Sequence, residues 1–275
     1  MMVRLLMVAL ALGLAACASP SVPASYSEAS RIQQLRQLLP ADIILLGEQH
    51  DARDHQEVHR IVVTALAAQK ALAALTLEMA SQGRSTAQLA SDASEDAVRE
   101  ALQWNNEAWP WAAYGPAVMA AVRAGVPVLG ANLAASQNRS AMSQAELDAL
   151  LSAAALKAQQ QSVRSGHCEM LPESQIAPMT RIQIARDRAM AQTVSQAFQP
   201  GKTVVLLAGG GHVDRQLGVP LHLNPALRIQ SVLMQAEPFA EVAGAGKSFD
   251  AIWSAKPVPP VDYCAKFNST RRPQN

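Results

Sequence analysis

Five short apolar runs, separated by longer segments with helical periodicity, constrain the fold of this chain more than any other feature. The runs cover residues 42–46, 72–77, 126–129, 203–207 and 227–234. Apolar runs of this length without polar alternation are typical of strands buried on both faces of a parallel sheet. The segments between them then supply the helices of right-handed crossovers. We therefore expect an α/β fold with a mostly parallel β-sheet flanked by helices.

Apolar spacing and capping residues predict the helices. These cover residues 31–39, 56–69, 96–103, 115–123, 143–163 and 180–198. The fifth is expected to open with a capping box, in which Ser143 and Glu146 satisfy backbone donors at the helix start. Because the last two lie between the third and fourth strands, the sequence predicts a helical insertion around residues 135–200.

The N-terminus has the order of an export signal. Arg4 precedes an apolar run, residues 5–14, that is too short to span a bilayer but suits a signal-peptide core. The run closes on Leu14-Ala15-Ala16-Cys17, which resembles the bacterial lipobox, whose cysteine receives diacylglycerol. We therefore expect cleavage before Cys17 and lipidation of this residue.

This motif gives the expected division of the chain. Residues 1–16 form the lipoprotein signal peptide, residues 17–30 a lipid-anchored flexible spacer, and residues 31–275 a single α/β domain. Ala18 follows the cysteine, in the position where Asp retains many lipoproteins in the inner membrane. This sorting convention favours the outer membrane, with the domain facing the periplasm.

The charge of the chain excludes one class of partner. The signal peptide contains one of the 23 basic residues, so the mature chain carries 22 basic and 22 acidic residues. A neutral chain lacks the basic surface that nucleic-acid binding requires, and we expect no nucleic-acid partner.

Two cysteines, Cys168 and Cys264, remain in the mature domain. In an oxidising compartment, an even pair is most simply a disulfide. The alternative is that one of them is a free thiol acting as a nucleophile.

Polar side chains follow four of the predicted strands. In chain order they are Glu48-Gln49-His50, Glu78, Asn132 and Gly209-Gly210-Gly211-His212. The carboxyl ends of parallel strands meet at one edge of the sheet, where α/β proteins bind ligands. Buried carboxylates and imidazoles need partners, so these residues should pair with each other, a metal or a ligand.

Two further groups have alternative interpretations. His55 and His59 lie four residues apart and would share a helix face, where they could chelate a metal or simply point to solvent or cap a helix. Four of the 11 aromatic residues fall within residues 104–114, namely Trp104, Trp109, Trp111 and Tyr114. They form either a core patch under a loop or an apolar wall for a flat ligand, with Tyr114 offering an oxygen to iron.

Taken together, these residues resemble the ChaN-like haem-binding lipoproteins. The matching motifs run in the same order through nearly the whole mature chain: Leu45-Leu46-Gly47-Glu48-Gln49-His50-Asp51 with His55 and His59, Leu77-Glu78-Met79, Trp109 through Pro116, Gly130-Ala131-Asn132, His167-Cys168 with Leu171-Pro172, Arg186-Asp187 with Met190-Ala191, and Gly209 through His212. The family lies in a superfamily that resembles the erythromycin esterases and the Tiki metalloproteases.

The resemblance implies haem binding linked to iron acquisition, with haem supplied by an outer-membrane receptor. It also implies a homodimer, because haem would be held between two subunits through tyrosine and histidine. Tyr114 is then the preferred iron ligand, with Tyr263 as the alternative. His167 or Arg186 would bind the propionates.

The Tiki branch of the superfamily implies the competing function, a metal-dependent hydrolase. Glu48, His50, Glu78 and His212 match its divalent-metal ligands. Glu48 or Glu78 would act as the base on a metal-bound water. A third interpretation is a periplasmic scaffold lipoprotein whose site has decayed. The sequence leaves all three open and favours haem binding.

Overall fold

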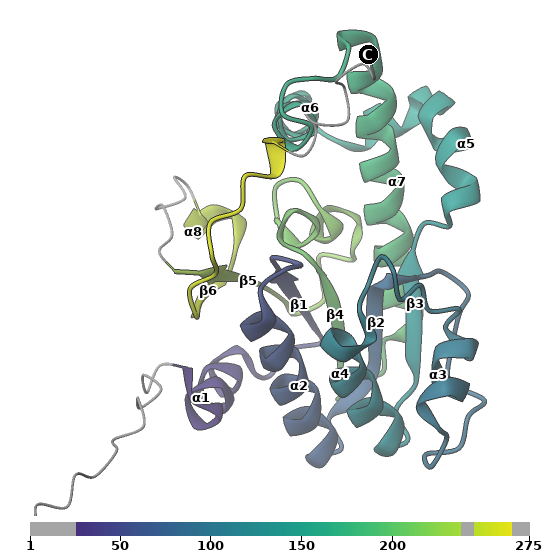
Figure 1. Cartoon of the computed structure of the whole chain (residues 1–275), viewed down its shortest axis with the longest axis vertical. Coiled ribbons are helices and arrows are strands. Elements are labelled where there is room, and N and C mark those ends of the chain that lie inside the picture. Colours follow the sequence, from purple (N-terminus) through teal and green to yellow (C-terminus); the bar gives the residue numbers. More distant parts are fainter. Residues whose placement is uncertain (1–25, 238–244, 266–275) are drawn as a thin grey trace, which may run out of the picture.

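The computed structural model describes residues 26–237 and 245–265, which form a six-stranded sheet between layers of helices (Figure 1). The strands are β1 (Ile43–Glu48), β2 (Leu72–Ser81), β3 (Val128–Asn132), β4 (Thr203–Gly209), β5 (Ile229–Ala236) and β6 (Ala251–Ala255). Their order is β3-β2-β4-β1-β5-β6, and all these pairings are parallel. The predicted α/β fold is confirmed. The sequence did not predict β6, a short edge strand in which only Trp253 and Ala255 are buried.

Eight α-helices and four 3₁₀ turns lie within the described residues. They are α1 (Glu28–Leu38), α2 (Arg53–Ala68), α3 (Glu95–Ala101), α4 (Trp111–Arg123), η2 (Ala135–Gln137), α5 (Asn138–Ser143), η3 (Ala145–Leu150), α6 (Ala153–Gly166), α7 (Glu173–Ala197), η4 (Gly210–Val213), η5 (Val219–His222) and α8 (Ala245–Ser248). In this part of the chain, no helix has both the length and the apolar character of a membrane span.

The first helix begins earlier than predicted. The side chain of Ser27 accepts a hydrogen bond from the Ser30 backbone at 3.2 Å and caps α1, which starts at Glu28. Residues 28–30 are therefore helical, although they were expected to belong to a flexible spacer over residues 17–30.

The long helix predicted over residues 143–163 is wrong. Ser143 ends α5 instead of opening a helix, and its hydroxyl donates to the Ser140 carbonyl at 2.8 Å. The residue that caps α6 is Ser152, which accepts from the Ala155 backbone at 3.2 Å. Between them, η3 turns Leu147 into a small core with α7, and this burial interrupts the helix.

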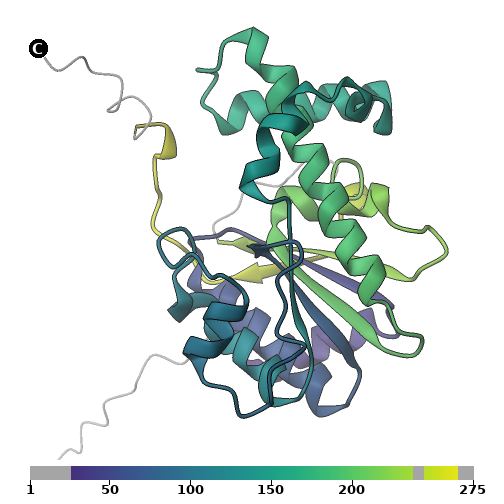
Figure 2. The same cartoon turned by 90° about the vertical axis from the view of Figure 1, so that its right-hand side faces the viewer.

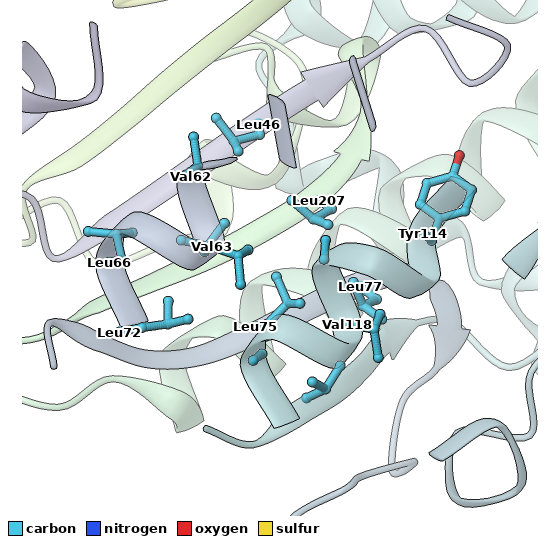
Figure 3. Packing of buried hydrophobic residues seen from close by; sticks show 14 of the residues in the cluster. Leu46, Val62, Val63, Leu66, Leu72, Leu75, Leu77, Tyr114, Val118 and Leu207 are labelled. Carbon is cyan, nitrogen blue, oxygen red and sulfur yellow. The ribbon is translucent and has the colours of Figure 1, made fainter. Parts of the chain in front are cut away.

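Both faces of the sheet are covered, as the uninterrupted apolar runs predict (Figure 2). Ile44 and Leu46 of β1 belong to the core beneath α2 and α4, which contains Val62 (Figure 3). Ile43 and Leu45 belong to the opposite core, beneath α7. Successive β1 side chains therefore anchor the strand to both helical layers and fix its position at the sheet centre.

Two features of the chain path create a site at the carboxyl edge of the sheet. From β1 the chain continues to β2, whereas from β4 it continues to β5, on the other side of β1. Strand order thus reverses between β1 and β4, where open α/β sheets bind ligands. The predicted helical insertion lies above this edge as α5, α6 and the N-terminal part of α7 (Figure 1).

The segment after β6 runs across to this helical insertion (Figure 1). There, a disulfide joins Cys168, in the connection between α6 and α7, to Cys264. The insertion and the C-terminal segment therefore flank the carboxyl edge of the sheet.

Candidate functional site

A cavity of about 550 Å³ lies at the carboxyl edge of β1 and β4. Glu48 and His50 line it from the end of β1, and His212 lines it from η4, directly after β4. The end of α6 contributes His167, and the C-terminal segment contributes Tyr263. The volume falls within the range of small-molecule sites.

Glu48 is buried at the base of this cavity and has three side-chain hydrogen-bond partners, and His59 Nδ1 lies 3.7 Å from its Oε2. Its Oε1 accepts from the Tyr114 hydroxyl at 2.5 Å and lies 2.7 Å from His50 Nδ1. Its Oε2 accepts from Gln56 Nε2 at 3.0 Å. Burial raises the pKa of Glu48, but the hydrogen bonds from His50 and Tyr114 outweigh it, and the net pKa is lowered. Glu48 is therefore a carboxylate at neutral pH.

The pKa of His50 shifts in the opposite direction to that of Glu48. Burial lowers its pKa, but the hydrogen bond to Glu48 and the charge of Glu78 raise it above the ordinary value. The imidazole also contacts Trp109 edge-on, with ring centroids 4.8 Å apart. A Cβ on Gly209 would lie 3.0 Å from His50 Nε2, so the absent side chain makes room for the ring.

His212 belongs to a second pair of an imidazole and a carboxylate. Its Nδ1 lies 2.6 Å from Asp187 Oδ1, and its Nε2 lies 3.6 Å from Glu78 Oε1. Burial lowers the pKa of His212, but the charges of Glu78 and Asp187 raise it to about 9. Burial raises the pKa of Asp187 to about 6, so the two form an ion pair at neutral pH.

Asp187 was not predicted as a site residue, because it lies within α7 and not after a strand. Glu78 is held from the neighbouring strand, where its Oε2 accepts from the Gly209 backbone at 2.7 Å. Asn132, by contrast, turns its amide back to the Glu78 carbonyl at 2.9 Å. Looking for polar residues directly after each strand therefore located Glu78 and His212. It could not locate Asp187, which orients His212 from within a helix.

His55 and His59 share the buried face of α2, as their spacing indicated. His55 Nδ1 accepts from the Gln49 backbone at 2.9 Å. His55 Nε2 and both ring nitrogens of His59 are buried without a hydrogen-bond partner among the described residues. Burial lowers the pKa of both rings, that of His55 to about 4, so both are neutral.

The predicted metal ligands are arranged as separate pairs, Glu48 with His50 and Glu78 with His212. Across residues 26–237 and 245–265, no group of three or more His, Cys, Asp or Glu side chains could hold a metal ion. The structure therefore gives no support to the expected divalent metal or to a hydrolase that depends on it.

The aromatic cluster is a core patch. Trp104, Trp109 and Trp111 pack against the main hydrophobic core, and Tyr114 is 1% exposed within it (Figure 3). These four side chains do not line the cavity. The Tyr114 hydroxyl donates a hydrogen bond to the buried carboxylate of Glu48. The residue that was preferred as an iron ligand therefore holds Glu48 in position instead.

The other three residues named for haem lie in different positions. His167 and Tyr263 line the cavity. Tyr263 is 50% exposed, and its hydroxyl donates to Asp51 and accepts from Gln49 Nε2 at 3.5 Å. Arg186 does not line the cavity. Its positive charge partly opposes the rise in the pKa values of Asp187 and His212.

Comparison with known proteins identifies the family. Residues 34–223, more than half of the chain, match the model of the family described as "Haem-binding uptake, Tiki superfamily, ChaN". The chain belongs to this family. No curated protein matches the sequence of this ChaN-family chain at a significant level.

Solved structures also match this chain. One, described as cofacial haem binding to ChaN of Campylobacter jejuni, matches with a TM-score of 0.64 and 24% identity, over 80% of this chain and 90% of that one. The type III effector HopBA1 matches with a TM-score of 0.45 and 15% identity, over 79% of this chain and 88% of that one. The first likeness agrees with the observed α/β fold.

We predict that His55→Asn reduces the acid sensitivity of folding. The pKa of His55 is about 4 in the folded chain and about 6.5 when unfolded, so between these values the unfolded chain binds more protons. Acidification therefore destabilises the wild type. From pH 7 to 5.5, the free energy of unfolding should fall by about 1 kcal/mol more in the wild type than in the variant.

Urea denaturation at both pH values measures this difference. Asn is chosen because its side-chain oxygen can accept the Gln49 backbone hydrogen bond that His55 Nδ1 accepts. If wild type and variant lose the same free energy between the two pH values, His55 is not a neutral buried base.

Proposed function

We propose that this protein binds haem in the cavity between the ends of β1 and β4 and takes part in haem uptake. The observation that carries this proposal is the donor set: the imidazoles of His50, His167 and His212 and the phenol of Tyr263 line one cavity. Imidazole and phenolate are both protein ligands of haem iron. Membership of the haem-binding uptake family supports the same ligand.

The rest of the lining suits a flat, apolar molecule. Gly166 and the run Gly209-Gly210-Gly211 contribute backbone without side chains, and a Cβ on Gly166 or Gly211 would meet nothing within 4 Å. Val163 and Leu217 add apolar surface. Apolar walls with a few convergent polar groups are the usual composition of cofactor sites.

Tyr263 is the proposed iron ligand, in place of Tyr114. Its hydroxyl lies at the cavity, where Asp51 and Gln49 position it by hydrogen bonds. The Tyr114 hydroxyl is buried against the carboxylate of Glu48, and burial and this charge raise its pKa. To release Tyr114 for iron, Glu48 would have to lose a hydrogen-bond donor in a buried site, which is costly.

The propionates require partners at the same cavity that carry a positive charge or donate hydrogen bonds. We assign them to His212, whose pair with Asp187 keeps it protonated, and to His167, which lines the cavity from α6. Arg186, the other residue expected in this role, does not line the cavity and is not included.

We predict that haem titration distinguishes the two tyrosines. In the soluble domain from Ala18 onward, Tyr263→Phe should change the Soret spectrum and weaken haem binding at least about tenfold, equivalent to about 1.4 kcal/mol. Tyr114→Phe is the matched control and should keep the wild-type spectrum. A wild-type domain that binds no haem would contradict the function, whereas a normal Tyr263→Phe spectrum would contradict only the ligand assignment.

We further propose that two copies of the chain share the bound haem as a homodimer. Tyr263 is half exposed at the cavity, so its surroundings can be completed by a second copy. Sedimentation of the titrated samples tests this proposal, because the sedimenting mass should double on haem addition. A monomer at saturating haem would contradict it.

We propose that the Cys168–Cys264 disulfide holds two haem-contacting residues in position. Each half-cystine directly follows a cavity residue, since Cys168 follows His167 and Cys264 follows Tyr263. The C-terminal segment before Tyr263 is largely exposed and has little packing of its own to hold it. The covalent link therefore keeps two proposed haem contacts at the cavity.

We predict that the double variant Cys168→Ser/Cys264→Ser binds haem about tenfold more weakly than the wild type, because Tyr263 loses its fixed position. Titration at a temperature where circular dichroism shows the variant folded separates this effect from lost stability. Tyr263→Phe in the same background should cause no further loss. An unchanged affinity in the double variant would show that the disulfide does not position the site.

We also propose that the chain is an outer-membrane lipoprotein, anchored through Cys17 and facing the periplasm, where an outer-membrane receptor supplies haem. Cys17 lies outside the described residues, and the proposal is supported by the lipobox-like sequence. A tether raises the local concentration of the domain near the membrane without adding a contact to haem.

We predict that Cys17→Ala leaves haem affinity in solution unchanged and abolishes support of growth on haem iron. Membrane fractionation of cells should show that the variant no longer partitions with the outer membrane. Growth equal to the wild type would indicate that the anchor is not needed for uptake.

A further inference from the structure

A second cavity, of about 520 Å³, lies on another side of α7. Gln183 and Asp187 lie on the side of α7 that faces the first cavity. Arg188 and Gln192, four residues apart on the same helix, line the second cavity. This cavity shares no lining residue with the proposed haem site.

The second cavity is lined mainly by polar side chains, and its charged lining residue is a cation. Four glutamines line it, Gln82, Gln137, Gln144 and Gln192, together with Arg188. No Asp or Glu belongs to its lining within the described part of the chain. A guanidinium without a carboxylate beside it, at the edge of a concave site, favours an anionic ligand.

One glutamine is held in place by α7. Gln82 Nε2 donates to the Ala189 carbonyl, to Gln192 Oε1 and to Thr193 Oγ1, each at 3.3 Å. This contact occupies the side-chain oxygen of Gln192 and leaves its NH₂ group as a donor. The amides at the end of β2 and on α7 are therefore already oriented, which lowers the entropy cost of binding.

His222 provides an independent sign of a missing partner. Its Nε2 is buried and has no hydrogen-bond partner among the described residues. His222 and Arg188 both line the cavity and are close enough for the Arg188 charge to lower the pKa of the imidazole. Buried polar atoms of this kind usually bind a ligand or a water molecule.

We propose that this second cavity binds a small polyhydroxylated carboxylate, such as a sugar acid. Arg188 would pair with the carboxylate through its two parallel N–H donors. The glutamine amides carry both donors and acceptors, as hydroxyl groups do. Leu133 and Leu147, which also line the cavity, would contact the carbon skeleton.

Calorimetric titration of the full-length protein in detergent, with gluconate and glucuronate as probes, tests this site. At least one probe should bind with a dissociation constant below about 1 mM. Arg188→Gln should weaken binding at least about tenfold. Arg36→Gln, an exposed arginine of α1, is the matched control and should bind as the wild type does.

Three results would overturn the proposal. They are the absence of binding by both sugar acids, equal binding of glucose, which lacks the carboxylate, and equal binding of sulfate, which lacks the hydroxyls. Arg188→Gln should also retain wild-type haem titration, because Arg188 lies outside the first cavity. If that variant loses both ligands, its effect is general and the second site is not supported.

Discussion

The parallel pairing of β1 with β4 at the centre of the sheet sets Glu48 beside Gly209 in register. Because the strand order reverses between these strands, their carboxyl ends leave room for a ligand. Gly209 makes space for the His50 ring, and its backbone N–H holds Glu78. The positions of Glu48, His50 and Glu78 at the first cavity thus depend on this one strand pairing.

The site balances buried charge by pairing. Glu48 with His50 and Asp187 with His212 are two carboxylate–imidazole pairs, with Glu78 on the side of His212. An isolated buried charge would be costly, and each pair reduces that cost while keeping an imidazole at the cavity. The arrangement explains how so many ionisable groups can lie together in one partly buried site.

The helical insertion and the C-terminal segment convert an open sheet edge into a cavity that remains partly open to solvent. Neither is part of the central sheet, and the Cys168–Cys264 disulfide ties one to the other. The same insertion forms one wall of the second cavity, through Gln144 and Leu147. The helix α7 lies between the two cavities, so one long helix supports two chemically different sites.

The sequence by itself determined the α/β fold, five of the six strands and the sheet edge where Glu48, Glu78 and His212 meet, because strand burial and parallel direction follow from apolar runs separated by helices. The sequence did not decide whether the aromatic residues within residues 104–114 belong to the hydrophobic core or contact a ligand. Only tertiary packing placed Tyr114 beneath Glu48, Asp187 behind His212 and Tyr263 at the cavity. These contacts join segments far apart in the chain. The direction of each side chain depends on which helices and strands pack together, and no local sequence pattern specifies that packing.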